Sequence, residues 1–208
     1  MVTLAGAAFV VSCLLVLAAG CSGDLPTEPT RQASSGPTSS PRLQAEDEYG
    51  RYTSSEYDFS LKYPKSYKSA NAAPNERSSG SVFARVWVSG TSDSPIVMSV
   101  CVRRVSDWPD WGAEDLLDEM RARLSAGQGG PGETNVMLLD GQLTTCAGRP
   151  AAWWESSYTS NGAPTIEKDY FLVGRRFSYQ ITYAAGAVDY SAHAGQFKHL
   201  VSSFRLLR

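Results

Sequence analysis

The chain has 208 residues, of which 42% are hydrophobic and 11% aromatic, so it is long enough for one domain with a sizeable core. Its 19 Lys and Arg residues nearly balance its 21 Asp and Glu residues, and the formal net charge is −2. This balance, without any block of basic residues, gives no indication of nucleic-acid binding or of a polybasic membrane contact.

The first segment is apolar and ends in a cysteine. Residues 1–20 carry no charged side chain, and the run LAAG at 17–20 places small residues directly before Cys21. This pattern resembles the lipobox of bacterial lipoproteins. The resemblance implies a signal peptide at 1–20 and a lipidated Cys21, whose fatty acids (palmitate among them) hold the chain on the outer, extracytoplasmic face of the cell membrane. A plain anchor of about 20 apolar residues is the alternative.

Residues 21–55 have the composition of a tether. After Cys21 they are rich in Pro, Ser, Thr, Gly and charge and nearly free of aliphatic side chains. Such a segment cannot bury enough apolar surface to offset its chain entropy, so we expect it to be disordered. As a flexible coil it spans on the order of 30 Å. The folded domain is therefore predicted to occupy residues 56–208.

The domain begins with strand patterns. Alternating apolar and polar residues predict a strand at Tyr57–Tyr63, which stops at Pro64. Two Val-rich alternating runs, Ser81–Ser89 and Pro95–Val105, flank a turn-rich stretch and predict a hairpin.

A helix is predicted next, over about Trp111–Ser125. Asp107 and Asp110 supply capping side chains and Pro109 an early helical proline, while Gly127 ends the pattern. The apolar residues at helical spacing are Ala113, Leu117, Met120 and Leu124.

The second half is predicted to continue as antiparallel strands. Val136–Leu139 and Gln142–Cys146 flank Asp140-Gly141, a favoured hairpin turn. The remaining strands are predicted at Ala151–Tyr158, Thr165–Val173 and Phe177–Tyr183, with Phe177, Tyr179, Ile181 and Tyr183 sharing one face.

The last element is a helix from about Asp189 or Tyr190 to Ser203, with Phe197, Leu200, Val201 and Phe204 on one side. Together these elements predict an α+β fold, in which a single antiparallel sheet of about six to eight strands is sandwiched with two main helices.

Three short motifs resemble the PsbP-like family. They are YDFSLKYPKSY at 57–67, GRPAAWWE at 148–155 and FKHLVSSFRL at 197–206. The family includes the extrinsic photosystem II subunit and bacterial exported lipoproteins of the LpqN or DcrB type. These motifs are packing signatures and not chemical ones. The resemblance implies an α/β/α sandwich and a non-catalytic accessory protein that binds other proteins.

Cys101 and Cys146 are the two cysteines of the predicted domain. An even number of cysteines in an exported chain indicates a disulfide, which would contribute about 4 kcal/mol by closing the loop between them. Two separate buried thiols are the alternative.

Residues for catalysis or metal binding are scarce. The chain has only two histidines, His193 and His199, which lie about 240° apart around the predicted helix and cannot hold one metal together. No G-x-S-x-G elbow, Gly-rich phosphate loop or CxxC pair is present. The sequence therefore predicts no enzyme, no cofactor and no metal.

Trp108 and Trp111 are the best candidates for a binding surface. They flank Pro109-Asp110 at the entrance of the first predicted helix, where large aromatic side chains can remain partly uncovered. Burial of both tryptophans in the core is the alternative.

We expect a membrane-tethered envelope lipoprotein that binds an envelope protein as an accessory or assembly factor. A lipoprotein that binds a small apolar ligand or lipid is the alternative, and it requires a sizeable apolar cavity between sheet and helix. A hydrolase would require His193 or His199 in a cleft beside a carboxylate and a serine.

Overall fold

The computed structural model describes residues 48–70, 81–91, 94–107 and 111–207. The predicted signal peptide, Cys21, most of the predicted tether and Trp108 lie outside these residues. Within the described ranges, no helix has both the length and the apolar character needed to cross a membrane.

Strands dominate the described chain, with one helix near the middle and one near the end. The helical elements are the 3-10 turn η1 (Val105–Asp107), α2 (Ala113–Ser125) and α3 (Tyr190–Ser203). The strands are β1 (Tyr49–Ser54), β2 (Phe59–Pro64), β3 (Lys68–Ala70), β4 (Ser81–Gly90), β5 (Pro95–Arg104), β6 (Glu133–Cys146), β7 (Arg149–Ser160), β8 (Ala163–Val173), β9 (Phe177–Gly186) and β10 (Arg205–Leu206).

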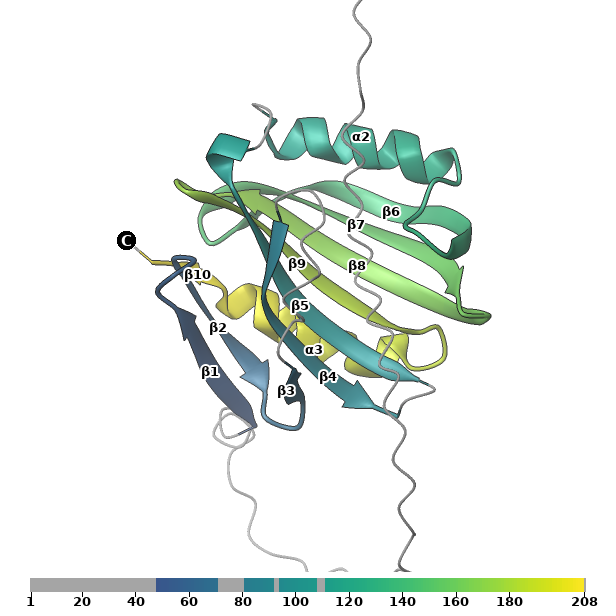
Figure 1. Ribbon diagram of the computed structural model, residues 1–208, viewed down its shortest axis with the longest axis horizontal. Coiled ribbons are helices and arrows are strands. Elements are labelled where there is room, and N and C mark those ends of the chain that lie inside the picture. Colours follow the sequence, from purple (N-terminus) through teal and green to yellow (C-terminus); the bar gives the residue numbers. More distant parts are fainter. Residues whose placement is uncertain (1–47, 71–80, 92–93, 108–110, 208) are drawn as a thin grey trace, which may run out of the picture.

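These strands form two antiparallel sheets. The large sheet has seven strands in the order β3-β4-β5-β9-β8-β7-β6, and the small sheet has the order β1-β2-β10. Figure 1 shows α2 on one face of the large sheet and α3 on the other, with the small sheet beside α3. The predicted α+β sandwich with two main helices is confirmed, and the small sheet is an addition to it.

The larger core lies between the sheet, α3 and β2. The four predicted side chains of β9 all belong to it, because alternate residues of a strand point to the same face. Phe197, Leu200 and Phe204 approach them from α3 and its end, and Phe59 and Leu61 approach from β2. This core joins both sheets into one domain.

A smaller core lies under α2. Leu116, Leu117 and Met120 pack there against Trp154 and other residues of β7 and β8. Gly141 allows this close packing, because a Cβ atom at that position would lie 3.2 Å from the Leu117 Cδ1 atom. The neighbouring Trp153 faces the other side of the sheet, as strand alternation requires, and stacks on Tyr170.

The hairpin predicted at Asp140-Gly141 is wrong. β6 runs without a turn from Glu133 to Cys146, and Gly141 pairs with Trp154 of β7. The pairing register shifts between Thr134 and Met137 and again between Leu138 and Asp140. Both irregularities, which have the spacing of β-bulges, lie before Asp140-Gly141, and the two residues that the sequence pattern assigned to a turn are regularly paired.

Other turns and strands follow the prediction. β4 and β5 form the expected hairpin, and β7 and β8 are joined at Asn161-Gly162, whose φ angles of 49° and 81° suit a type I′ turn. β1 differs, because it falls inside the segment that composition assigned to the tether. Its residues Tyr49 and Tyr52 pack onto the domain, where Tyr52 contacts Trp87.

The predicted disulfide is absent: Cys101 and Cys146 are both buried free thiols. Cys101 lies on β5 and Cys146 at the end of β6, with three strands between β5 and β6. Four strand spacings span roughly 19 Å, whereas a disulfide requires Cα atoms within about 7 Å. Burial raises the pKa of the Cys146 thiol to about 11, so this thiol is a core residue.

Candidate functional site

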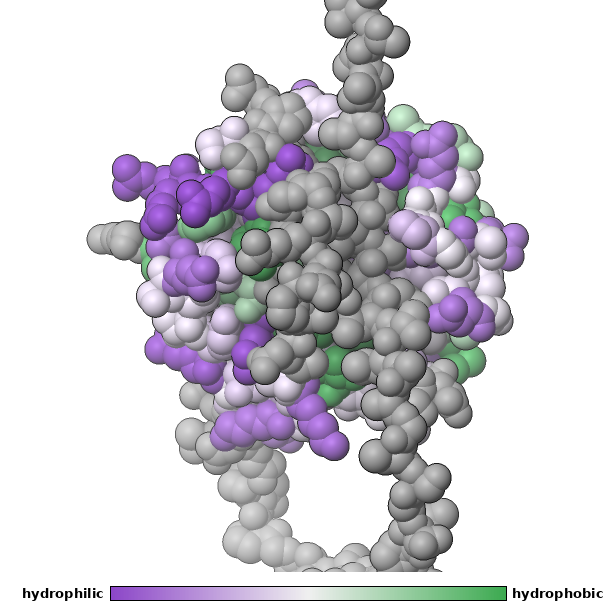
Figure 2. Space-filling model, viewed as in Figure 1, coloured by the Kyte–Doolittle hydropathy of each residue, from purple (hydrophilic) through white to green (hydrophobic). Residues whose placement is uncertain are grey.

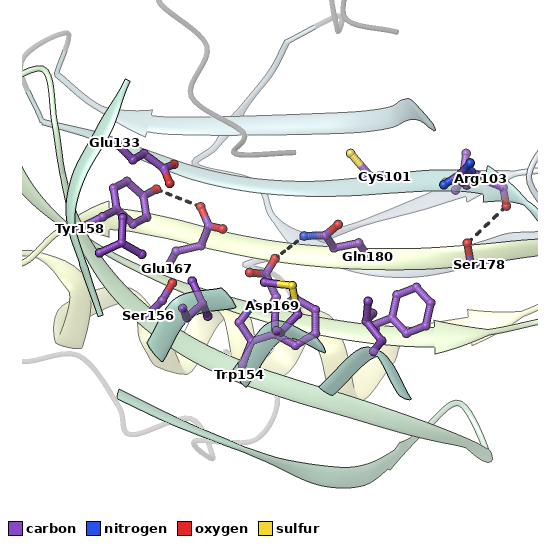
Figure 3. A pocket seen from close by; sticks show the side chains of 16 residues that line it. Cys101, Arg103, Glu133, Trp154, Ser156, Tyr158, Glu167, Asp169, Ser178 and Gln180 are labelled. Carbon is purple, nitrogen blue, oxygen red and sulfur yellow. Dashed lines mark hydrogen bonds between the residues drawn. The ribbon is translucent and has the colours of Figure 1, made fainter. Parts of the chain in front are cut away.

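A small pocket of mixed polar and apolar lining lies between α2 and the large sheet (Figure 3). Its volume is about 30 Å³, which is room for one or two water molecules. Sites for small organic ligands usually have about 300–1,000 Å³. The pocket is therefore too small for the apolar ligand that the alternative function requires.

Buried carboxyl groups form the floor of this pocket. Asp169, 1% exposed, accepts hydrogen bonds at Oδ1 from Thr182 Oγ1 at 2.6 Å and from Gln180 Nε2 at 2.9 Å. Burial raises the pKa of Asp169, while its hydrogen bonds act in the opposite direction. Beside it, Glu167 accepts a hydrogen bond from the Tyr158 hydroxyl at 2.9 Å.

Glu133 stands at one end of the pocket and Arg103 at the other (Figure 3). Glu133 accepts a hydrogen bond at Oε2 from the backbone N–H of Gly130, at 2.6 Å. Burial raises the pKa of Glu133; the Gly130 hydrogen bond lowers it and the nearby charge of Asp169 raises it. Burial thus favours the neutral forms of Asp169 and Glu133. Within the described residues, no group of three or more His, Cys, Asp or Glu side chains could hold a metal.

The two histidines lie in different surroundings. His193 Nδ1 lies 3.1 Å from the Tyr67 hydroxyl and 3.1 Å from Gln196 Oε1. His199 stacks on Tyr49, with ring centroids 3.9 Å apart, and lines a groove that holds serines but no carboxylate.

This groove is basic. It lies between the small sheet and the end of α3 and has a volume of about 280 Å³. Its charged and polar side chains are Arg51, Ser60, Lys62, His199, Ser202, Ser203 and Arg205. Two of its serines are already engaged, because Ser202 Oγ donates to the His199 carbonyl and Ser203 Oγ to the Leu200 carbonyl. The arrangement favours an anion and supplies no activated nucleophile.

Three exposed apolar side chains lie along β6. Pairing opposite Ser157 places Met137 on one face of the sheet, and pairing opposite Ala152 places Leu143 on the other. Met137, Leu139 and Leu143 are 55%, 44% and 51% exposed, and β6 is the edge strand of the large sheet. We call these three residues the β6 surface. On the face shown in Figure 2, hydrophobic residues form small separate patches among hydrophilic ones. Three large apolar side chains on one edge strand are therefore a distinctive feature.

The predicted tryptophan surface is described only in part. Trp111 is partly buried and packs against the core under α2, just before the helix begins. Trp108 lies outside the described residues, and the surface around both tryptophans stays a prediction. The β6 surface and the basic groove were missed by sequence reasoning, because only strand register places their residues at an edge or side by side.

Comparison with solved structures shows which folds this domain resembles. No protein-family model and no curated protein sequence matches the chain. The cyanobacterial PsbP protein CyanoP of Synechocystis is similar in structure, with a TM-score of 0.52 and 15% identity, over 76% of this chain and 92% of that one. LpqN, described as involved in cell envelope biogenesis of Mycobacterium tuberculosis, has a TM-score of 0.50 and 14% identity, over 83% and 100%. These similarities show a PsbP-like fold.

Proposed function

We propose that this protein is an extracytoplasmic lipoprotein that is tethered to the membrane by Cys21 and binds another envelope protein through its PsbP-like domain. In this role it is a non-enzymatic accessory or assembly factor. The lipobox-like run before Cys21 supports the tether. The shared fold with LpqN supports a place in the envelope, since LpqN is described as involved in cell envelope biogenesis.

The observation that carries the binding role is the β6 surface. Exposed apolar groups on an otherwise mixed surface are features of protein contacts, because their burial in a partner releases water. Met137 and Leu143 project from an edge strand, where a partner can reach them from outside the sheet.

The other two functional classes have less support. The pocket under α2, at about 30 Å³, is too small for an apolar ligand. The groove around His199 has no carboxylate in its lining, so a Ser–His–acid arrangement has no third member there.

The tether predicts the behaviour of a Cys21→Ser variant. Without the sulfur that carries the lipid, the protein should lose all label from radioactive fatty acid. It should be released into the medium or remain as a precursor that is not cleaved. The measurement is fatty-acid labelling combined with cell fractionation, and a variant that is still labelled would contradict the tether.

The binding role predicts site-specific crosslinking. A photo-reactive amino acid at Leu143 should form one discrete adduct with an envelope protein in intact cells. The same residue at Val188 is the matched control, because Val188 is an exposed apolar residue (89% exposed) outside the β6 surface.

Equal adducts from Leu143 and Val188, or none from Leu143, would count against the β6 surface as the contact. Neither residue is part of the core, so we expect both labelled proteins to fold normally.

A further inference from the structure

The basic groove places three cations on one face of the small sheet. Arg51 of β1 is the direct cross-strand partner of Lys62 in β2, and Arg205 of β10 pairs with Ser60 of β2. Residues directly opposite in an antiparallel pair point to the same face, and so do residues two apart in one strand. All four side chains therefore face the groove that they line.

This arrangement concentrates positive charge. Like charges directly opposite in a sheet repel each other, and the described residues that line the groove include no acidic one. The Arg51 guanidinium makes no hydrogen bond or ion pair with the described residues. Arg205 uses only Nη1 in its bonds to the carbonyls of Ser202 and Phe204, at 2.7 Å each, so its other donors remain available.

The floor of the groove adds an unused hydroxyl group. Ser60 is only 7% exposed, yet its side chain has no hydrogen-bond partner among the described residues. Buried hydroxyl groups are normally satisfied. A hydroxyl between cations, without a partner, is suited to donate to an anion oxygen.

The groove also lies where the chain enters the domain. The ring of Tyr49, at the start of β1, stacks on His199 of the groove. In the sequence, Glu48 and Tyr49 directly follow the segment that leads from Cys21. If the chain is anchored at Cys21, the tether therefore joins the domain next to this groove.

We infer that the groove between the small sheet and α3 binds the phosphate group of an anionic membrane phospholipid. Arg51 and Arg205 present planar donor groups that match phosphate oxygens, Lys62 adds a point charge, and Ser60 donates from below. The membrane as the source of the phosphate rests on the proposed tether at Cys21. The contact would hold the domain against the headgroups and complement the lipid anchor.

The test uses the chain from residue 21 onward with Cys21→Ser, which keeps every described residue and removes the lipid. Binding to vesicles of phosphatidylglycerol mixed with phosphatidylcholine is measured by sedimentation at physiological salt. Each cation near an anionic surface changes binding about fivefold, so Arg51→Gln with Lys62→Gln should weaken it roughly 20-fold. Ser60→Ala should weaken it less.

The matched control is Arg104→Gln with Arg149→Gln, which removes the same charge from exposed residues outside the groove. This pair should retain most of the binding. Equal losses in the two pairs, or equal binding to pure phosphatidylcholine vesicles, would overturn the inference. Neither Arg51 nor Lys62 belongs to the hydrophobic cores, so we expect the groove variant to fold like the parent chain.

A titration with inorganic phosphate distinguishes a lipid headgroup from free phosphate as the source of the anion. Shifts of the Ser60 and Lys62 amide resonances at low phosphate, without vesicle binding, would overturn the membrane as the source. Because the chain in these assays carries no lipid, the result is independent of the fatty-acid labelling. The inference and the proposed tether can therefore fail separately.

Discussion

Replacing Phe204 with alanine is expected to lower the free energy of unfolding by about 4 kcal/mol. Phe204 is completely buried and stacks on Phe59, with ring centroids 5.4 Å apart. It also meets the edge of Tyr179 at 5.4 Å. The substitution leaves a cavity where α3, β2 and β9 meet, and few side chains can move to fill it.

The measurement is urea unfolding followed by tryptophan fluorescence. Phe204→Leu keeps most of the volume and should cost about 1–1.5 kcal/mol. Leu207→Ala is the matched control three residues later, at a side chain that is 37% exposed, and should cost little. The total free energy of unfolding of domains of this size is about 5–15 kcal/mol, so the Phe204→Ala variant should be only marginally stable. A loss below about 1 kcal/mol would refute the packing role.

The second expected result is a stability that falls as the pH rises. Burial raises the pKa of Asp169, and also that of Glu133. In the unfolded chain an aspartate has a pKa of about 3.9. Above that pH the unfolded chain releases a proton that the folded protein still holds. The contribution of these two carboxyls to stability is therefore fully present below about pH 4 and is lost as the pH rises through their folded pKa values.

Asp169→Asn should reduce this slope, because asparagine carries no titratable proton but keeps an oxygen for Thr182 and Gln180. Each coupled carboxyl changes the free energy of unfolding by about 1.4 kcal/mol per pH unit in its window. Asp169→Ala instead removes the acceptor and should cost about 1–3 kcal/mol for each donor left unsatisfied. Urea unfolding at several pH values measures both effects, and an unchanged slope in Asp169→Asn would contradict the assignment.

Local patterns predicted most of the fold. The face shared by alternate residues of β9 and the turn at Asn161-Gly162 depend only on neighbouring residues, and both match the structure. β1 was missed because four of its six residues are Gly, Arg, Thr and Ser, which give no strand pattern. The residues before it also have the composition of a disordered segment. Pairing with β2, a contact outside the local window, stabilises it as a strand.

The errors in β6 and in the cysteines have the same origin. Asp140-Gly141 favours a turn locally, but β6 forms eleven residue pairs with β7 and continues through these two residues as a strand. The even cysteine count indicated a disulfide, but the order of strands in the sheet separates Cys101 from Cys146. Neither the pairing nor the order is encoded in a short window of sequence.

The buried carboxyls and the basic groove are equally non-local. The alternation of β8 places Glu167 and Asp169 on the same face as Phe171, yet acidic residues in a strand usually face water. Thr182 and Gln180 of β9 satisfy Asp169 there, and only the register of β8 on β9 reveals this. Arg205 is likewise brought to Arg51 and Lys62 by β10, a strand far from β1 and β2 in the sequence.

The irregular edge of the large sheet has a consequence for crowding. A long, straight edge strand with apolar side chains can add strands from other copies and grow into fibrils. Two bulges in β6 break its row of backbone donors and acceptors, and Arg121 of α2 donates to the Gly141 carbonyl at 2.7 Å. Met137 and Leu143 can thus be offered to a partner, while further strands find no continuous template. Copies at high local concentration are therefore not expected to polymerise through β6.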